Sequence, residues 1–327
     1  MTSTARPRSV VRLRAGAATL ALATAVALAG CTGDGTRPAS DETSEPTVTG
    51  GTGSPSGSPS GSPSESPSEA PAEEPTEQPT DEPTATGTAA PVYYAGDGPG
   101  GRTVLYREFH RVEGDPLIEA ARLVAGSGQP DDPDYRTLWP GGALTSVQAT
   151  DGLLVVELAD DGWATPAEGM TRREARLAVQ QLVYTLQGVQ QERVPVQVLL
   201  GSEPTTLFGV DTSEPFTAAS ALRTLNLVSI TSPAEGDTVT GDTLTVTGVA
   251  NSFEASGPCR LLQDGQELAL EGYQSEGWMD DRLFPFQVDI PLDGVSGEVV
   301  VQCETDDPSG GAEGPGPAID TRTITVR

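Results

Sequence analysis

The chain has 327 residues, with 47 acidic side chains against 19 lysine and arginine residues, and a net charge of −28 at pH 7. A charge this negative excludes electrostatic binding to nucleic acid or to an anionic membrane surface. Any contact of this chain with a membrane must therefore depend on something other than charge attraction.

Residues 1–30 are predicted to form a signal peptide. Four arginines precede an uncharged, mostly apolar run over residues 15–29. This run is shorter than the about 20 residues that a bilayer span needs, and it fits the apolar region of a secretory signal. Leu28, Ala29, Gly30 and Cys31 then resemble the lipobox of bacterial lipoproteins. The resemblance implies cleavage after Gly30 and a diacylglycerol on the Cys31 thiol. An ordinary signal peptide with an incidental cysteine is the alternative.

Residues 31–90 are predicted to be a disordered tether. Serine, proline and glutamate dominate this segment, and large apolar side chains are almost absent. Burial therefore cannot offset the entropy lost on ordering. Fully extended as polyproline II, the tether would reach about 180 Å, enough to carry a folded part into the cell-wall layer. Residues 91–327 remain, which suffice for two domains.

The first folded region, residues 91–218, is predicted to be an α+β domain with its helices on one face of a sheet. Asp115 before Pro116 is a typical helix start, and Thr171 with Glu174 forms a capping-box pattern. Asp151-Gly152 is a strong hairpin signal. The predicted elements are strands 92–97 and 103–112, a helix from residue 116 to about Gly126, strands 144–149 and 153–158, a helix after Thr171 that stops at Gly188, and strand 194–200.

This region resembles the GerMN domain of bacterial sporulation and germination proteins. The segments that carry the resemblance are LYREFHRV, PLIEAARLVAG, TLWPGGALTSVQATDGLLVVELAD, EARLAVQQLVYTL and VPVQVLLG, in that order. The resemblance implies a non-catalytic module for assembly in the cell envelope.

The second folded region, residues 223–327, is predicted to be an all-β sandwich of about seven strands. Apolar residues alternate with polar ones over short segments between glycine-rich turns, which predicts a sheet with one buried face. The alternating positions include Phe284, Phe286, Val288 and Ile290, then Val299, Val301 and Cys303, then Ile324 and Val326.

The segment SITSPAEGDTVTGDTLTVTGVANSFEA resembles the immunoglobulin-like domain of bacterial spore germination proteins, above all at Phe253, Glu254 and Ala255. Cys259 and Cys303 fall in two predicted strands, and an exported protein lies in an oxidising compartment. We therefore expect a Cys259–Cys303 disulfide, with two free buried thiols as the alternative.

The sequence predicts no catalytic residue, metal or cofactor. His110, the single histidine, lies in a predicted strand, and we expect it to be structural. Gly96, Gly98 and Gly101 match G-x-G-x-x-G, but a strand follows where a phosphate-binding loop needs a helix. We interpret the match as a turn.

Two patterns keep other functions open. Clustered acids could serve a hydrolase through paired carboxylates, or bind calcium, although a solvated surface is the simpler interpretation. These acids are Asp131, Asp132 and Asp134, then Asp160 and Asp161, Asp280 and Asp281, and Asp306 and Asp307. Four aromatic residues could form a sugar-stacking surface, namely Trp139, Trp163, Tyr273 and Trp278.

We expect a non-enzymatic envelope protein on the outer face of the cytoplasmic membrane, held there by its lipid anchor only. Its expected role is protein–protein interaction or assembly, as an adaptor to a membrane or wall-synthesis complex, with an envelope protein as partner and no nucleic acid. The alternative is a lipoprotein that binds cell-wall glycan or a small ligand, including contact with peptidoglycan.

The lipobox gives a direct prediction. A Cys31→Ser variant cannot accept a thioether-linked lipid, so it should leave the membrane fraction of the producing cell. Fractionation followed by immunoblotting measures this change. Full retention of the variant in the membrane fraction would show that the anchor is assigned wrongly.

Overall fold

The computed structural model describes residues 87–309, 312 and 314–327. The predicted signal peptide and tether, with Leu28, Ala29, Gly30 and Cys31, lie outside the described residues. Within the described part of the chain, no helix combines the length and the apolar character that crossing a membrane demands.

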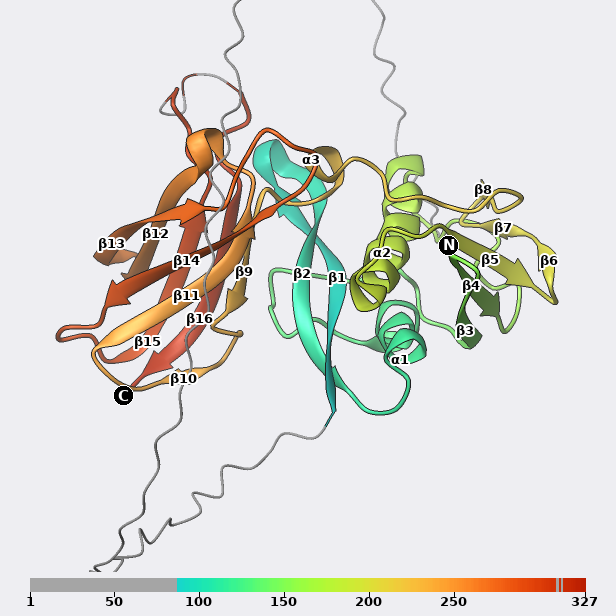
Figure 1. Ribbon diagram of the computed structural model, residues 1–327, viewed down its shortest axis with the longest axis horizontal. Coiled ribbons are helices and arrows are strands. Elements are labelled where there is room, and N and C mark those ends of the chain that lie inside the picture. The colour runs from blue at the N-terminus through green and yellow to red at the C-terminus, as the bar shows by residue number, and fades with distance from the viewer. Residues whose placement is uncertain (1–86, 310–311, 313) are drawn as a thin grey trace, which may run out of the picture. The chain divides into compact units, whose positions relative to one another are not determined.

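A long β-hairpin opens the described fold (Figure 1). β1 (Thr88–Gly98) pairs antiparallel with β2 (Arg102–Val112) along its full length, through the short turn η1 (Pro99–Gly101). Gly100 and Gly101 have φ angles of 68° and 70°, which glycine adopts without steric cost. Of the G-x-G-x-x-G match, Gly101 lies in this turn as predicted, whereas Gly96 and Gly98 lie in β1.

Two helices and a second sheet complete the α+β region. The Asp115 carboxylate accepts a hydrogen bond from Leu117 N, and the capping box of Thr171 and Glu174 is present. The helical elements are α1 (Pro116–Arg122), its π-helical extension η2 (Leu123–Ser127), and α2 (Arg172–Gln190). The sheet contains, in spatial order, β3 (Leu144–Thr150), β4 (Leu153–Leu158), β5 (Val196–Leu200) and β6 (Glu203–Pro204). β7 (Thr206–Leu207) and β8 (Val210–Asp211) form a separate pair.

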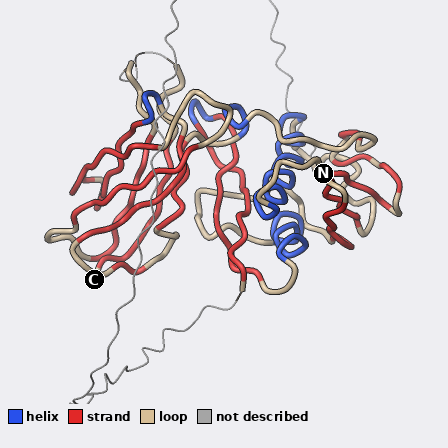
Figure 2. Tube along the Cα trace, viewed as in Figure 1, coloured by secondary structure: helices blue, strands red, loops and turns tan. Residues whose placement is uncertain are grey.

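The layering differs from the prediction of one sheet with helices on one face. The hairpin is a sheet of its own, and α1 and α2 lie between it and β3–β5 (Figure 2). Gly188 also does not end α2, which continues to Gln190 and ends at Gln191 in a left-handed conformation. Gly188 instead allows close packing on the hairpin, because a Cβ there would lie 2.8 Å from Cγ of Pro91.

The C-terminal region is a β-sandwich, as predicted, with eight strands rather than about seven. After the short helix α3 (Ala221–Thr224), the strands are β9 (Val228–Ser232), β10 (Thr238–Val239), β11 (Thr243–Ala250), β12 (Ser256–Gln263), β13 (Gln266–Ser275), β14 (Phe284–Pro291), β15 (Gly297–Glu304) and β16 (Ile319–Val326). Their order is β10-β16-β15-β12-β13-β14-β11-β9. β9 and β16 nevertheless lie in contact, because the sheet folds back on itself around one apolar core.

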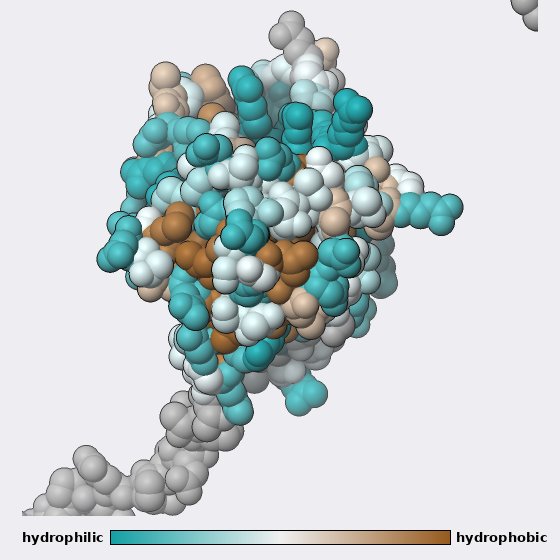
Figure 3. All heavy atoms as spheres, turned by 90° about the vertical axis from the view of Figure 1, so that its right-hand side faces the viewer, coloured by the Kyte–Doolittle hydropathy of each residue, from teal (hydrophilic) through white to brown (hydrophobic). Residues whose placement is uncertain are grey.

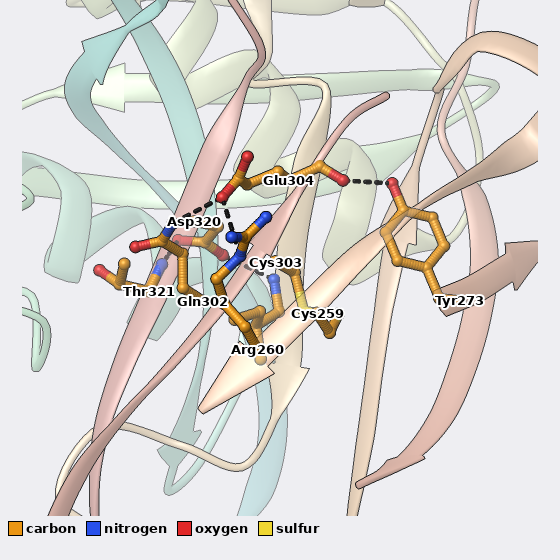
Figure 4. Close-up of a disulfide and its surroundings, with 9 residues drawn as sticks. Cys259, Arg260, Tyr273, Gln302, Cys303, Glu304, Asp320 and Thr321 are labelled. Carbon is orange, nitrogen blue, oxygen red and sulfur yellow. Dashed lines mark hydrogen bonds and ion pairs between the residues drawn. A yellow bond between two sulfur atoms is a disulfide. The ribbon is translucent and has the colours of Figure 1, made fainter. Parts of the chain in front are cut away.

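Cys259 and Cys303 form a disulfide inside this core. They are register partners on the neighbouring strands β12 and β15, so the bond joins strands of one sheet, and both residues are fully buried. Figure 4 shows the adjoining polar groups, among which Arg260 pairs with Glu304 and the Tyr273 hydroxyl donates to the Glu304 carbonyl.

The disulfide should stabilise the sandwich by restricting its unfolded state. Its sequence separation of 44 residues corresponds to about 4 kcal/mol in the chain-entropy model. Urea unfolding should therefore give a free energy lower by up to about 4 kcal/mol when the bond is reduced. A Cys259→Ala/Cys303→Ala variant is the control and should not respond to reductant. Equal urea midpoints for the oxidised and reduced wild-type protein would contradict this role.

Candidate functional site

The four aromatic residues considered for sugar stacking do not form one surface. Trp139 and Trp163 are buried and pack edge to face with ring centroids 4.9 Å apart, and Tyr273 is also buried. Only Trp278 is exposed, at 37%, where it packs edge to face against Phe253. The exposed aromatic surface here is thus one pair of rings, Phe253 and Trp278.

Phe253–Ala255, the residues that carry the sequence resemblance, form the turn η3, which presents Phe253 to Trp278. Glu254 and Ala255 have φ angles of 52° and 61°, a left-handed conformation that non-glycine residues rarely adopt. The Ala255 carbonyl holds the turn by accepting a hydrogen bond from the Ser275 hydroxyl at 3.0 Å. The motif therefore shapes a surface turn.

His110 supports a buried carboxylate. Its Nε2 lies 3.1 Å from Glu108 Oε2, and Glu108 also accepts the backbone N–H groups of Asp131 and Asp132. Glu108, His110 and Asp131 are close enough together to be considered as metal ligands. However, both Glu108 oxygens are already engaged with the protein, so we assign this cluster a structural role.

Members of the acid clusters accept hydrogen bonds at the surface, some from neighbouring and some from distant residues. Asp160 accepts from Gly162 N, and Asp281 accepts from the Ser220 hydroxyl and Leu222 N. Asp132 is the exception, because it is buried at 2% exposure.

Asp132 meets Arg322, which reaches it from β16 of the sandwich. Arg322 Nη1 lies 2.5 Å from Asp132 Oδ2 and 3.2 Å from Asp320 Oδ1. Nη2 donates to the Ile230 carbonyl of β9 at 3.2 Å. All three charged side chains are at most 3% exposed. A buried guanidinium thus joins the α+β region to the sandwich.

Tyr135 closes the same cluster. Its hydroxyl donates to Asp320 Oδ1, and it receives a hydrogen bond of 2.8 Å from Arg322 Nη1. Its ring stacks on Tyr106 of the hairpin at a centroid distance of 4.5 Å. We call Asp132, Tyr135, Asp320 and Arg322 the buried arginine cluster.

The cluster contains two carboxylates for one guanidinium, and its electrostatics reflect this imbalance. Burial raises the pKa of Asp132 to about 7, although Arg322 and a hydrogen bond from Asp134 N oppose the rise. Burial also raises the pKa of Asp320, again against the effect of Arg322. The cluster therefore retains a proton more readily than isolated carboxylates would.

Further contacts cross between the same two regions. Arg107 Nη2 of β2 donates to Thr231 Oγ1 of β9 at 2.8 Å. Asn226 N donates to the Leu105 carbonyl at 2.8 Å, and the Asn226 side chain donates to the Ile319 carbonyl at 2.9 Å. A small apolar cluster lies beside them and contains Ala95, Leu105, Leu177, Tyr184, Ala221 and Leu225.

The sequence interpretation missed Arg322 and Asp320, although a signal was present. Ile324 and Val326 were assigned to the buried face of a strand, and a period of two places residues 320 and 322 on that face too. Charged residues at buried strand positions require partners. The local sequence pattern does not reveal that these partners are Asp132 and Tyr135.

Comparison with known proteins agrees with this division of the chain. The family described as "Sporulation and spore germination" matches residues 91–206, and the family described as "Immunoglobulin-like domain of bacterial spore germination" matches residues 227–312. No curated protein matches the chain.

Two solved structures are similar in part. The tandem GerMN domains of the sporulation protein GerM from Bacillus subtilis show 12% identity over 62% of this chain and 60% of that one, with a TM-score of 0.33. An engineered protein shows 18% identity over 40% of this chain and 24% of that one, with a TM-score of 0.26.

The fold defines a two-domain protein in which an α+β domain precedes a β-sandwich. More specifically, the α+β domain matches the sporulation and spore germination family, and the sandwich matches the immunoglobulin-like domain of bacterial spore germination. Both domains come from germination-related families that are not known as enzymes.

The raised pKa of Asp132 predicts a pH dependence of stability. Between about 4 and 7 the folded protein holds a proton on Asp132 that the unfolded chain releases, so this residue makes the free energy of unfolding decrease as pH rises. An Asp132→Asn variant should lose this contribution and show a flatter profile than the wild type.

Urea unfolding at several pH values from 4.5 to 7.5 measures the difference. Asp293→Asn is the matched control, because Asp293 is exposed. Parallel profiles for the wild type and Asp132→Asn would refute the assignment.

Proposed function

We propose that this protein is a non-enzymatic, lipid-anchored interaction or assembly module of the cell envelope. The single observation that carries the proposal is the buried arginine cluster, which joins two domains of germination-related families through buried ion pairs and hydrogen bonds. A pair of domains held in one orientation can present a composite surface to a partner.

The anchoring part of the proposal comes from the sequence. The resemblance of Leu28–Cys31 to a lipobox supports a lipid on Cys31. The Ser/Pro/Glu-rich composition of residues 31–90 supports a tether. The folded domains would then extend from the outer face of the cytoplasmic membrane into the wall layer.

One surface supports contact with a partner protein. The outer face of the sheet β3–β6 carries Leu153, Val155 and Leu199, each half-buried, among polar side chains that include Glu157 and Gln197, on the side opposite the helices. Figure 3 views the end of the unit that carries this sheet and shows hydrophobic residues gathered among polar ones. An envelope protein of a membrane or wall-synthesis complex is the proposed partner.

Binding to cell-wall glycan is the second candidate. It is supported by the exposed pair Phe253 and Trp278, beside Met279 at 77% exposure. An exposed aromatic pair can stack on a sugar ring.

Crosslinked capture on the native tether, followed by mass spectrometry, distinguishes the two candidates. The assembly role predicts reproducible capture of an envelope protein. Val155→Glu should reduce the amount captured, and Phe253→Ser should leave it unchanged. Recovery of wall glycan without a protein, lost in Phe253→Ser, would favour the second candidate. If neither variant changes what is recovered, both surfaces are assigned wrongly.

A further inference from the structure

A pocket of about 270 Å³ lies beside the domain contact and concentrates positive charge. The hairpin, the C-terminal end of α2 and the loop before β14 all contribute to its wall. Its chemically relevant lining residues are Tyr93, Arg107, Tyr184, Glu192, Arg193 and Arg282. We call this the arginine pocket.

The charge of the pocket is opposite to that of the chain. Three arginines face one glutamate there, in a protein with a net charge of −28. In the described part of the chain, neither Arg107 nor Arg193 forms an ion pair. Arg282 lies 3.4 Å from Asp280, but both side chains are more than half exposed, so this contact is weak.

Arg107 has unused hydrogen-bonding capacity. Its Nη2 donates to Thr231, whereas its Nε is buried without a partner among the described residues. A guanidinium offers five N–H donors in a planar fork that matches carboxylate and phosphate oxygens. A buried donor without a partner is costly, and an oxyanion would satisfy it.

Two tyrosines form the apolar wall of the pocket. The rings of Tyr93 and Tyr184 lie 5.3 Å apart, and the Tyr184 hydroxyl is fixed by donation to the Ala219 carbonyl at 2.6 Å. The pocket therefore offers an aromatic surface beside cationic groups. Its volume suits a ligand of a few carbon atoms.

We propose that the arginine pocket binds a small dianion, either a phosphomonoester or a dicarboxylate. Arg107 and Arg193, which form no ion pair among the described residues, supply two positive charges for such a ligand. Bidentate arginine contacts to such oxyanions are among the strongest hydrogen bonds in proteins. This binding site is independent of any protein partner on the β3–β6 sheet.

Isothermal titration calorimetry of the full chain at low ionic strength tests the proposal. The probes are glycerol 3-phosphate and succinate, with glycerol as the uncharged control. We expect saturable binding of one equivalent of at least one dianion, weakened by added salt, and no binding of glycerol. Binding of the first probe alone identifies a phosphate ligand, and binding of the second alone identifies a carboxylate ligand.

Arg193→Gln provides the decisive variant, because Arg193 is exposed and its replacement should not disturb folding. Loss of a charged donor should weaken binding at least about tenfold. Arg102→Gln is the matched control, since it makes the same charge change at an exposed position outside the pocket and should leave affinity unchanged. Absence of saturable binding by both dianions, or equal affinities for the wild type and Arg193→Gln, would overturn the proposal.

Discussion

The guanidinium of Arg322, enclosed between Asp132 and Asp320, is the constraint on which the arrangement of the two domains depends. Removing one cation and two carboxylates from water costs several kcal/mol per ion. The structure offsets this cost with hydrogen bonds to Tyr135, to the Ile230 carbonyl and between the charged groups themselves. Such a cluster tolerates few alternative geometries, so we infer that it determines orientation more than it adds stability.

The β1–β2 hairpin shows what this constraint achieves. An isolated two-stranded hairpin is marginally stable in water, yet here its residues enter two different cores. Tyr94 and Val104 belong to the α+β core, whereas Ala95 and Leu105 belong to the small cluster with Ala221 and Leu225. Apolar burial thus supplies the attraction, and the buried arginine cluster selects one arrangement. The same arrangement closes the arginine pocket, whose walls come from both domains.

Much of the fold could be predicted because its signals are local. The capping box at Thr171, the turn at Asp151-Gly152 and the period-two pattern of β14 depend only on neighbouring residues. Gly188 was misassigned as a helix stop because its role is to let α2 approach Pro91, a residue distant in sequence.

The candidate sites were less predictable for the same reason. Asp132 resembled its exposed neighbours Asp131 and Asp134 in sequence, and only the fold places Arg322 against it. The arginine pocket draws its cations from a strand, from the segment after α2 and from a sandwich loop. No local pattern could have grouped Arg107, Arg193 and Arg282. The Cys259–Cys303 disulfide could be predicted from the sequence, because only these two cysteines remained once Cys31 was assigned to the lipid.

The central claim is that the buried arginine cluster makes the two domains one cooperative unit. Differential scanning calorimetry of the wild type and of Arg322→Met tests it most directly. The account predicts a single wild-type transition, with equal calorimetric and van't Hoff enthalpies, that separates into two in the variant. Two independent transitions in the wild type, or a single transition with an unchanged Tm in Arg322→Met, would contradict it.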